Sequence, residues 1–278
     1  MTQGLAIALK AAAISLMTLA ITPAFAAEGH QPERESWTFA GPFGHFDKGQ
    51  LQRGFKVYKE VCSSCHALSL ISFRNLAEEG GPGFSEAQAR VIAQDYKVQD
   101  GPDDSGQMFE RTAKLSDRFP SPFPNDEAAR AANGGALPPD FSLLAKARSY
   151  ESGFPWFILD ALTQYQEQGP DYIHAIITGY RQPPAGVEGK PGLHYNVAFP
   201  GNWIAMPPPI SDGQVEYTDG TPQTVDQYSR DVASFMMWAA EPHLEARKRI
   251  GFEAIVFLIG LALLLFFTKR RVWSNVEH

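Results

Sequence analysis

The chain has 278 residues, of which 44% are hydrophobic, so it has enough apolar material for a sizeable core. Its formal net charge at pH 7 is -7, which argues against nucleic acid as a partner and favours basic proteins. It contains two cysteines, which is too few for a disulfide framework.

The first stretch has the features of a secretory signal peptide. Lys10 supplies a positive charge, residues 11–21 form a short apolar run, and Ala24-Phe25-Ala26 is a typical cleavage pattern. An uncleaved anchor is the alternative, but the run is short for a membrane span. We expect residues 1–26 to be removed and residues 27–246 to form a domain on the periplasmic side of a bacterial inner membrane.

The first part of that domain combines an irregular segment with a helix. Residues 37–46 are aromatic and glycine-rich, and we expect them to lie irregularly on the domain surface, with His45 in a structural role. Residues 50–61 carry apolar side chains at helical spacing, with Gly54 where another helix could approach closely. The apolar positions are Leu51, Phe55 and Tyr58.

The predicted helix leads directly into Cys62-Ser63-Ser64-Cys65-His66. C-x-x-C-H is the haem c attachment signature, in which Cys62 and Cys65 add to the haem vinyl groups and His66 can reach the iron as the proximal axial ligand. A redox C-x-x-C would give the histidine no role, and a zinc site would need a second pair of ligands. We therefore predict one covalently bound haem c, with its iron.

Three further helices are predicted, over residues 86–96, 170–178 and 224–239. The first and third begin with capping boxes, and the second ends at a glycine. The signals are Ser85 with Gln88, Thr224 with Gln227, and Gly179. No strand pattern of useful length is present. The expected fold is mainly α: a class I cytochrome c-like haem domain whose first and last helices cross near the haem, with long loop insertions and one C-terminal transmembrane helix.

Two long segments exceed what a minimal haem c domain needs, at residues 98–133 and 180–223. The first is acidic, and a solvated face is the default interpretation, with docking of a basic redox partner as an elaboration. A calcium loop is the alternative, but the spacing lacks the alternation and terminal glutamate of an EF-hand.

A second apolar run lies near the C-terminus. Residues 250–267, at about 1.5 Å each, span about 27 Å, which is close to the hydrocarbon thickness of a membrane. Basic triplets at 247–249 and 269–271 flank the run evenly, so the positive-inside rule alone does not orient it. The signal peptide does: we predict an anchor at 247–270 and a cytoplasmic tail at 271–278.

An electron-transfer haem commonly has a second axial ligand from the protein. Met206 is followed by three prolines, which stiffen the backbone and could hold a thioether against iron. Met206 is our choice from the residues alone. Met236 and Met237 fall within the last predicted helix, where at least one should belong to the core, and the alternatives that remain open are Met108 and a histidine.

Several motifs together resemble cytochrome c1, the haem c subunit of the quinol:cytochrome c oxidoreductase (cytochrome bc1) complex. The resemblance covers nearly the whole mature chain, and the motifs occur in the family's order. They are Arg53-Gly54-Phe55-Lys56-Val57-Tyr58 leading into the C-x-x-C-H motif, Ala132-Asn133-Gly134-Gly135-Ala136-Leu137-Pro138-Pro139-Asp140, Asp171-Tyr172 through Thr178-Gly179-Tyr180, Met206 with its three prolines, and Arg247-Lys248-Arg249 before a single anchor.

The resemblance implies a set of cofactor-binding residues. It implies axial ligation of the iron by His66 and Met206. On the propionate side it implies Asn133, Arg148 and Tyr172, and along the haem edge Pro138 and Pro139. The chain departs from the family in an apparent insertion at residues 150–168 and in lacking the extra cysteine pair of some bacterial relatives.

The expected function is electron transfer from a Rieske iron-sulfur protein to a soluble or membrane-bound cytochrome c. It would take place beside cytochrome b in a respiratory or photosynthetic bc1 complex, expected to be dimeric, with no substrate chemistry of the chain's own. One alternative is a membrane-anchored monohaem subunit of a terminal oxidase or nitric oxide reductase. Another is a haem enzyme or gas sensor with an open coordination position.

Overall fold

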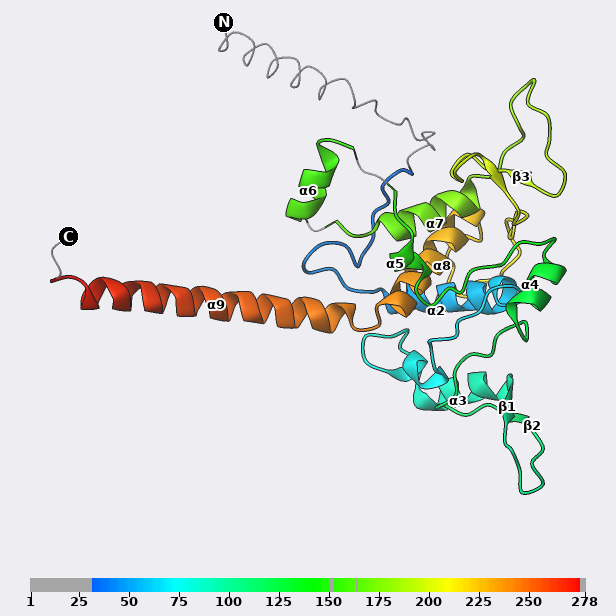
Figure 1. The fold of residues 1–278 in the computed structure, drawn as a ribbon, viewed down its shortest axis with the longest axis horizontal. Coiled ribbons are helices and arrows are strands. Elements are labelled where there is room, and N and C mark those ends of the chain that lie inside the picture. Colours follow the sequence, from blue (N-terminus) through cyan, green and yellow to red (C-terminus); the bar gives the residue numbers. More distant parts are fainter. Residues whose placement is uncertain (1–31, 151–152, 164, 276–278) are drawn as a thin grey trace, which may run out of the picture.

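The computed structural model describes residues 32–150, 153–163 and 165–275. These residues form a mainly helical body, from which one long helix, α9 (Leu244–Val272), projects (Figure 1). The predicted class, mainly helical with one C-terminal helix able to span a membrane, is confirmed. The predicted signal peptide lies outside the described residues.

Two helices cross at the centre of the body. Helix α2 (Lys48–Val57) packs against α8 (Val225–Ala240) at Gly54. A Cβ added to Gly54 would stand 2.0 Å from the Asp231 carbonyl oxygen and 2.7 Å from the Phe235 Cβ. Only a glycine allows the two backbones to come this close, so the predicted close crossing at Gly54 is confirmed.

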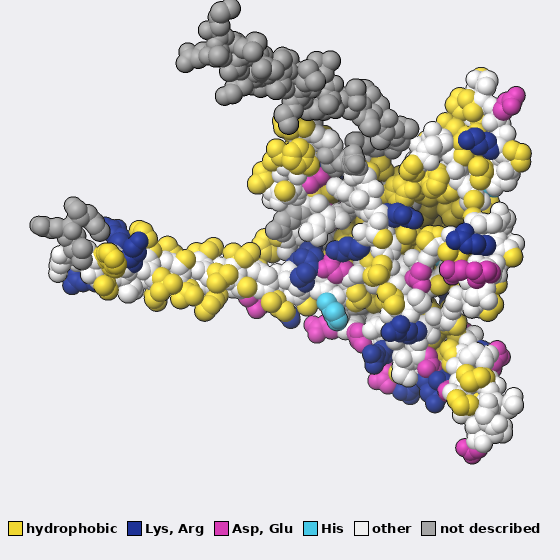
Figure 2. All heavy atoms as spheres, in the orientation of Figure 1, with side chains coloured by type: hydrophobic (Ala, Val, Ile, Leu, Met, Phe, Trp, Pro, Cys, Tyr) yellow, Lys and Arg dark blue, Asp and Glu magenta, His cyan; other side chains and the backbone are white. Residues whose placement is uncertain are grey.

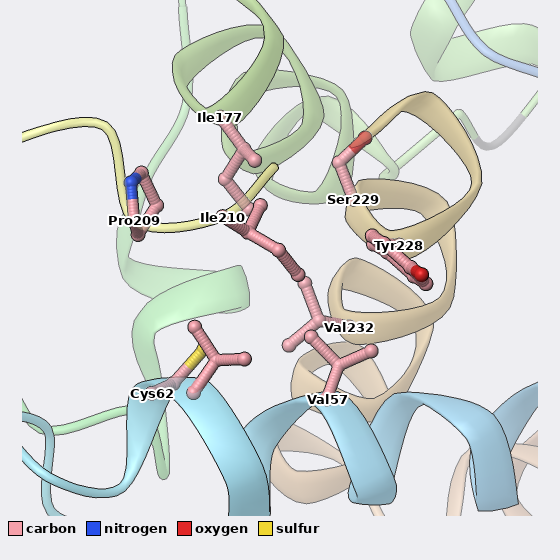
Figure 3. A pocket seen from close by; sticks show the side chains of 9 residues that line it. Val57, Cys62, Ile177, Pro209, Ile210, Tyr228, Ser229 and Val232 are labelled. Carbon is pink, nitrogen blue, oxygen red and sulfur yellow. The ribbon is translucent and has the colours of Figure 1, made fainter. Parts of the chain in front are cut away.

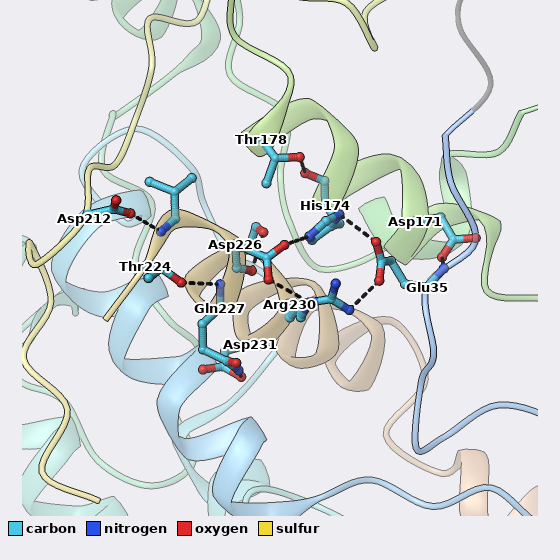
Figure 4. Close-up of polar contacts among 12 residues, drawn as sticks. Glu35, Asp171, His174, Thr178, Asp212, Thr224, Asp226, Gln227, Arg230 and Asp231 are labelled. Carbon is cyan, nitrogen blue, oxygen red and sulfur yellow. Dashed lines mark hydrogen bonds and ion pairs between the residues drawn. The ribbon is translucent and has the colours of Figure 1, made fainter. Parts of the chain in front are cut away.

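A buried carboxylate ties this crossing together. Asp231 is fully buried and accepts hydrogen bonds from the Arg53 Nε at 2.9 Å, the Tyr217 hydroxyl at 2.8 Å and the Gln227 side-chain amide at 2.8 Å. The predicted capping box at the start of α8 is therefore half formed. The Thr224 hydroxyl accepts from the Gln227 backbone N–H, but the Gln227 side chain goes to Asp231 instead of turning back to Thr224 (Figure 4).

Helix α7 (Gln168–Thr178) lies against α8 and is joined to it by polar contacts. His174 Nε2 is 2.9 Å from an Asp226 carboxylate oxygen, and its Nδ1 is 3.4 Å from a Glu35 oxygen (Figure 4). Arg230 pairs with both of these carboxylates. His174 thus links α7, α8 and the N-terminal segment.

Gly179 ends α7 as predicted, but for a different reason. Its φ of -88° is open to any residue, so no left-handed turn is present. A Cβ there would meet the Ala175 carbonyl oxygen at 2.5 Å and the Asn196 Oδ1 at 2.7 Å. A glycine is required at this position because a side chain would collide with its neighbours, and not because of the backbone conformation.

The segment at residues 37–46 is irregular as expected, but the prediction that it lies on the surface is wrong. Trp37, Phe39 and Phe46 are buried in the core, and the Trp37 and Phe39 rings stack at 5.3 Å. The Trp37 indole N–H donates to Asp171 at 2.8 Å. Because the segment has no regular period, its sequence does not reveal which aromatic side chains face inward.

The other elements are short. Helix α2 continues into a π-helical turn at Tyr58–Cys62. The predicted helix over residues 50–61 is therefore α-helical up to Val57 and π-helical from Tyr58 onward. Ser85 and Gln88 form both halves of the predicted capping box. The remaining helical elements are the 3₁₀ turn Phe73–Ala77, α3 (Glu86–Gln94), α4 (Asp126–Ala132), α5 (Leu144–Ala147) and α6 (Trp156–Thr163).

The two long segments contain two small antiparallel hairpins that the sequence did not predict. The first pairs β1 (Lys97–Asp100) with β2 (Phe109–Thr112), and the second pairs β3 (His194–Tyr195) with β4 (Trp203–Ile204). These strands have four and two residues, too few for an alternating pattern to emerge.

Helix α9 is, within the described ranges, the one helix long and apolar enough to cross a membrane. Hydrophobic side chains cover its length, and basic side chains gather near its far end (Figure 2). Its base is fastened to the body through Lys248, whose ammonium donates to the Phe39 carbonyl, and through buried Leu244.

Candidate haem site

The C-x-x-C-H motif follows the π-helical turn and folds back on itself. The backbone N–H groups of Cys65 and His66 donate to the Cys62 carbonyl at 3.1 and 2.9 Å. This turn keeps the two cysteines and the histidine together at the end of α2. Both cysteines are half-buried free thiols, and burial raises the pKa of the Cys62 thiol to about 12.

His66 is held in one orientation and one tautomer. Its ring is buried and stacks on Phe141, with centroids 4.2 Å apart. Its Nδ1 lies 2.8 Å from the Pro139 carbonyl oxygen, so Nδ1 carries the hydrogen that it donates. Burial lowers the pKa of His66 and keeps the ring neutral, which leaves the Nε2 lone pair for a metal.

A carboxylate fixes the loop that supplies the Pro139 carbonyl. Asp140 accepts hydrogen bonds from the Ser69 hydroxyl at 2.5 Å and from the Ser142 backbone N–H at 2.7 Å. Burial would raise the pKa of Asp140, but these hydrogen bonds outweigh it, so its pKa lies below the usual range. The loop is thereby joined to the chain just after the C-x-x-C-H motif.

An apolar hollow lies beside Cys62. Side chains of α2, α7 and α8 line it together with the segment after Met206 (Figure 3). Its lining residues are Val57, Val61, Cys62, Ile177, Pro209, Ile210, Tyr228, Ser229 and Val232. Apolar side chains beside a cysteine thiol suit an apolar ring bonded to that cysteine, so the chemical character of these residues fits a covalently attached haem.

Met206 stands three residues before this lining. It is half-buried, and its carbonyl accepts a hydrogen bond from the Tyr180 hydroxyl at 3.0 Å. Of the prolines that follow it, Pro209 reaches the hollow and the first two are exposed. The segment is thus held at the Met206 carbonyl and again at Pro209.

The other predicted residues fall into two groups. Pro138 and Pro139 are half-buried, and Pro139 is joined to His66 as described. Arg148, exposed at the end of α5, lies close enough to Tyr172 to oppose the rise in pKa that burial causes in that tyrosine. Asn133 ends α4, and its amide donates to the Ala129 carbonyl at 2.7 Å, a contact within its own helix.

Three residues that shape the site were not predicted from the sequence. These are Phe141 under the His66 ring, Asp140 in the adjoining loop and Tyr180 behind Met206. Asp140 and Tyr180 lie inside motifs quoted for the resemblance, and that position was the available signal. Nothing in the local pattern marks Phe141, because its partner is far away in the sequence.

These features define a class of protein. A buried neutral histidine follows two thiols, one of which lies beside an apolar hollow, and the described residues include one helix able to cross a membrane. This combination is that of a membrane-anchored c-type cytochrome.

Comparisons with known proteins make the assignment specific. The Cytochrome C1 family matches residues 37–276. Cytochrome c1 of Blastochloris viridis is 48% identical over 94% of this chain and 93% of its own length. Cytochrome c1-2, a mitochondrial heme protein of Solanum tuberosum, is 47% identical over 87% of this chain and 85% of its own.

A protein called cytochrome b/c1 from Bradyrhizobium diazoefficiens is 60% identical over 97% of this chain, and the chain spans 39% of that relative's length. The chain belongs to the cytochrome c1 family. It carries one covalently bound haem c and serves electron transfer in the bc1 complex, together with cytochrome b and the Rieske protein.

Proposed function

We propose that the chain takes electrons from the Rieske iron-sulfur protein and passes them to a cytochrome c, through an iron held by His66 and Met206. The observation that carries the proposal is the His66 imidazole, buried, neutral and fixed through Nδ1, with its Nε2 left for a metal. When bound, haem c supplies a one-electron ferric/ferrous couple.

The surroundings of the candidate methionines support Met206 as the second ligand. Met108 is 60% exposed at the edge of the first hairpin, whereas Met236 and Met237 are each 1% exposed inside the packed helix α8. Met206 is followed three and four residues later by Pro209 and Ile210, which line the hollow. A thioether there would occupy the remaining axial position and raise the reduction potential.

We assign Arg148 and Tyr172 to the propionate side. Their proximity on α5 and α7 supports a shared role, because a guanidinium and a phenol can both donate to a carboxylate. We also assign Asn133 to the propionate side. This assignment rests on the family resemblance alone, because the Asn133 amide donates a hydrogen bond within α4.

The acceptor is a basic cytochrome c on the periplasmic side, and the complex is dimeric. The acidic net charge of the chain supports the basic acceptor. The chemistry of attachment supports the location, because haem c is joined to apoprotein outside the cytoplasm. The anchor at 247–270 would leave residues 271–278 in the cytoplasm.

The test is a redox and optical titration of the full-length, haem-loaded protein in detergent, with carbon monoxide added to the ferrous form. We expect the unaltered protein not to bind carbon monoxide, because protein ligands would take both axial positions of the iron. Met206→Leu should bind carbon monoxide, and its reduction potential should be lower than that of the unaltered protein. Met108→Leu, at an exposed site, is the matched control and should behave like the unaltered protein.

Two results would contradict the proposal. If the unaltered protein binds carbon monoxide, the coordination position is open, as in a haem enzyme or gas sensor. If Met206→Leu stays inert and keeps its potential, another residue is the ligand.

A further inference from the structure

Helix α6 (Trp156–Thr163) has the reverse of the usual amphipathic arrangement of a soluble protein. Its one charged residue, Asp160, is 8% exposed and points inward to an ion pair with Arg34 at 2.7 Å. The large apolar side chains around it are exposed to between 41% and 81%. They are Phe154, Trp156, Phe157, Ile158, Leu159 and Leu162.

Exposing these apolar side chains to water is unfavourable in free energy. A soluble helix buries its apolar stripe and exposes its charges, and a contiguous apolar patch marks a contact with something apolar. The Arg34 guanidinium also lies over the Trp156 ring at 5.0 Å and over the Tyr165 ring at 4.4 Å. The polar contacts therefore fix α6 to the body while its apolar side chains are held outward.

The position of α6 indicates what covers it. Helix α9 runs along the horizontal direction of Figure 1, and α6 stands on the same side of the body, beyond the point where α9 begins. Glu167, which follows α6, interacts electrostatically with Lys248 at the base of α9. At that base the Phe43 ring, 74% exposed, meets the Phe252 ring of α9 at 5.5 Å.

Depth along α9 can be read as depth in the membrane. The apolar part of α9 begins at Ile250, just after the basic residues 247–249. Because α6 reaches past the start of α9, it stands level with the first turns of that helix (Figure 1), which carry the basic residues 247–249 just before the apolar part. Aromatic and aliphatic side chains at that level belong to the interface between headgroups and acyl chains.

We propose that α6 is a second membrane contact, lying in the lipid leaflet on the haem-domain side. Apart from buried Asp160 and Thr163 at its last position, every residue of α6 is apolar and exposed, and a fluid lipid phase can surround such a helix more completely than a single protein surface can. With α9, this contact would give the domain two points of attachment and restrict its rotation about the anchor. The proposal holds whichever protein accepts the electron.

The test measures the depth of a single label on the full-length, haem-loaded protein, assembled in its complex in lipid vesicles. Cys62 and Cys65 are consumed as haem thioethers, so Leu162→Cys, 75% exposed, gives this chain a single free thiol, which is labelled with a fluorescent probe before the chain is assembled with its partners. Phe252→Cys on α9 is the lipid reference, and Val91→Cys on α3, 62% exposed, is the aqueous reference. Phe154→Cys is a second position should Leu162→Cys fail to load haem.

We expect a quencher carried by lipid acyl chains to reduce the fluorescence of a label at residue 162 several-fold more strongly than that of a label at residue 91. The reduction should be nearly as strong as for a label at residue 252. A water-soluble quencher should show the opposite order. A label at residue 162 that responds as at residue 91 would mean that α6 is in water. A label shielded from both quenchers would mean that a protein, such as a neighbouring subunit, covers α6. Either result overturns the proposal.

Discussion

At Gly54, one hydrogen atom in place of a methyl group allows the central helices to cross. A methyl group there would stand 2.0 Å from the Asp231 carbonyl oxygen, which belongs to helical backbone and cannot swing away. The crossing also places α2 so that its end delivers the C-x-x-C-H motif to the hollow. The residue therefore acts on the site through the packing of two helices.

We expect Gly54→Ala to lower the free energy of unfolding by about 3 kcal/mol, because overpacking a rigid contact forces backbone shifts. Denaturant unfolding of the haem-loaded protein, followed by circular dichroism, measures the change. Gly189→Ala is the control, since a Cβ at Gly189 has nothing within 4 Å. Equal stability of the two variants would show that the helices can separate without cost.

Tyr180 holds the backbone of Met206 through one hydrogen bond of 3.0 Å. We expect Tyr180→Phe to remove about 1 kcal/mol of this support and to leave the fold intact. The methionine-to-ferric charge-transfer band should then disappear at a lower temperature than in the unaltered protein. Tyr195→Phe, in β3, is the control and should leave the band unchanged. An unaltered band in Tyr180→Phe would exclude a positioning role for Tyr180.

At the scale of elements, charges hold the first hairpin to the body. Arg111 on β2 pairs with Asp100 on β1, and its guanidinium donates to the two Asp117 carboxylate oxygens at 2.5 and 3.0 Å. Part of the acidic segment therefore pairs internally, while the predicted solvated face applies to the rest. The Asp117 backbone carbonyl in turn accepts from the Phe73 N–H at 3.0 Å, which ties the hairpin to the 3₁₀ turn.

The pH dependence of this tie follows from its charges. The Arg111 hydrogen bonds lower the pKa of Asp117 from 3.8 to about 2. A carboxyl whose folded pKa is lowered stabilises the fold above its unfolded pKa and loses that contribution as the pH falls toward the folded value. We expect stability to decline between about pH 4 and pH 2 through this group.

Asp117→Asn should flatten that part of the acid unfolding curve, because an amide does not titrate. Asp104→Asn, in the loop of the same hairpin, is the control and should preserve the decline. The measurement is the denaturant midpoint of the haem-loaded protein at a series of acidic pH values. If Asp117→Asn leaves the slope unchanged, the Arg111 pair does not contribute to stability in this range.

At the scale of the whole molecule, the net charge of -7 governs encounters with other proteins. The screening length falls from about 30 Å at 0.01 M salt to about 10 Å at 0.1 M. We expect the second-order rate of electron transfer to a basic cytochrome c to fall over this range. An acidic cytochrome c is the control and should show a flat or rising rate. A flat rate with the basic protein would remove the electrostatic part of our proposal.

Local signals were read correctly from the sequence where neighbouring residues set the structure. Ser85 with Gln88 starts α3, Thr224 starts α8, and the apolar run predicts a helix able to cross a membrane. The C-x-x-C-H motif predicted the haem because attachment needs two thiols and a histidine at fixed spacing in one stretch of chain. Such signals need no knowledge of distant segments.

Contacts between distant segments were decided only by the tertiary structure. Phe141 stacks on His66 and Asp160 points inward to Arg34 because the fold brings these residues together across long separations. The aromatic residues at 37–46 were misplaced for the same reason, since an irregular segment has no period from which to read its buried side. Short-range chemistry in the sequence predicted the haem c attachment and the five longer helices, whereas the short helices α4, α5 and α6 were not predicted. The packing that holds His66 and turns α6 outward depends on long-range contacts, which no local pattern contains.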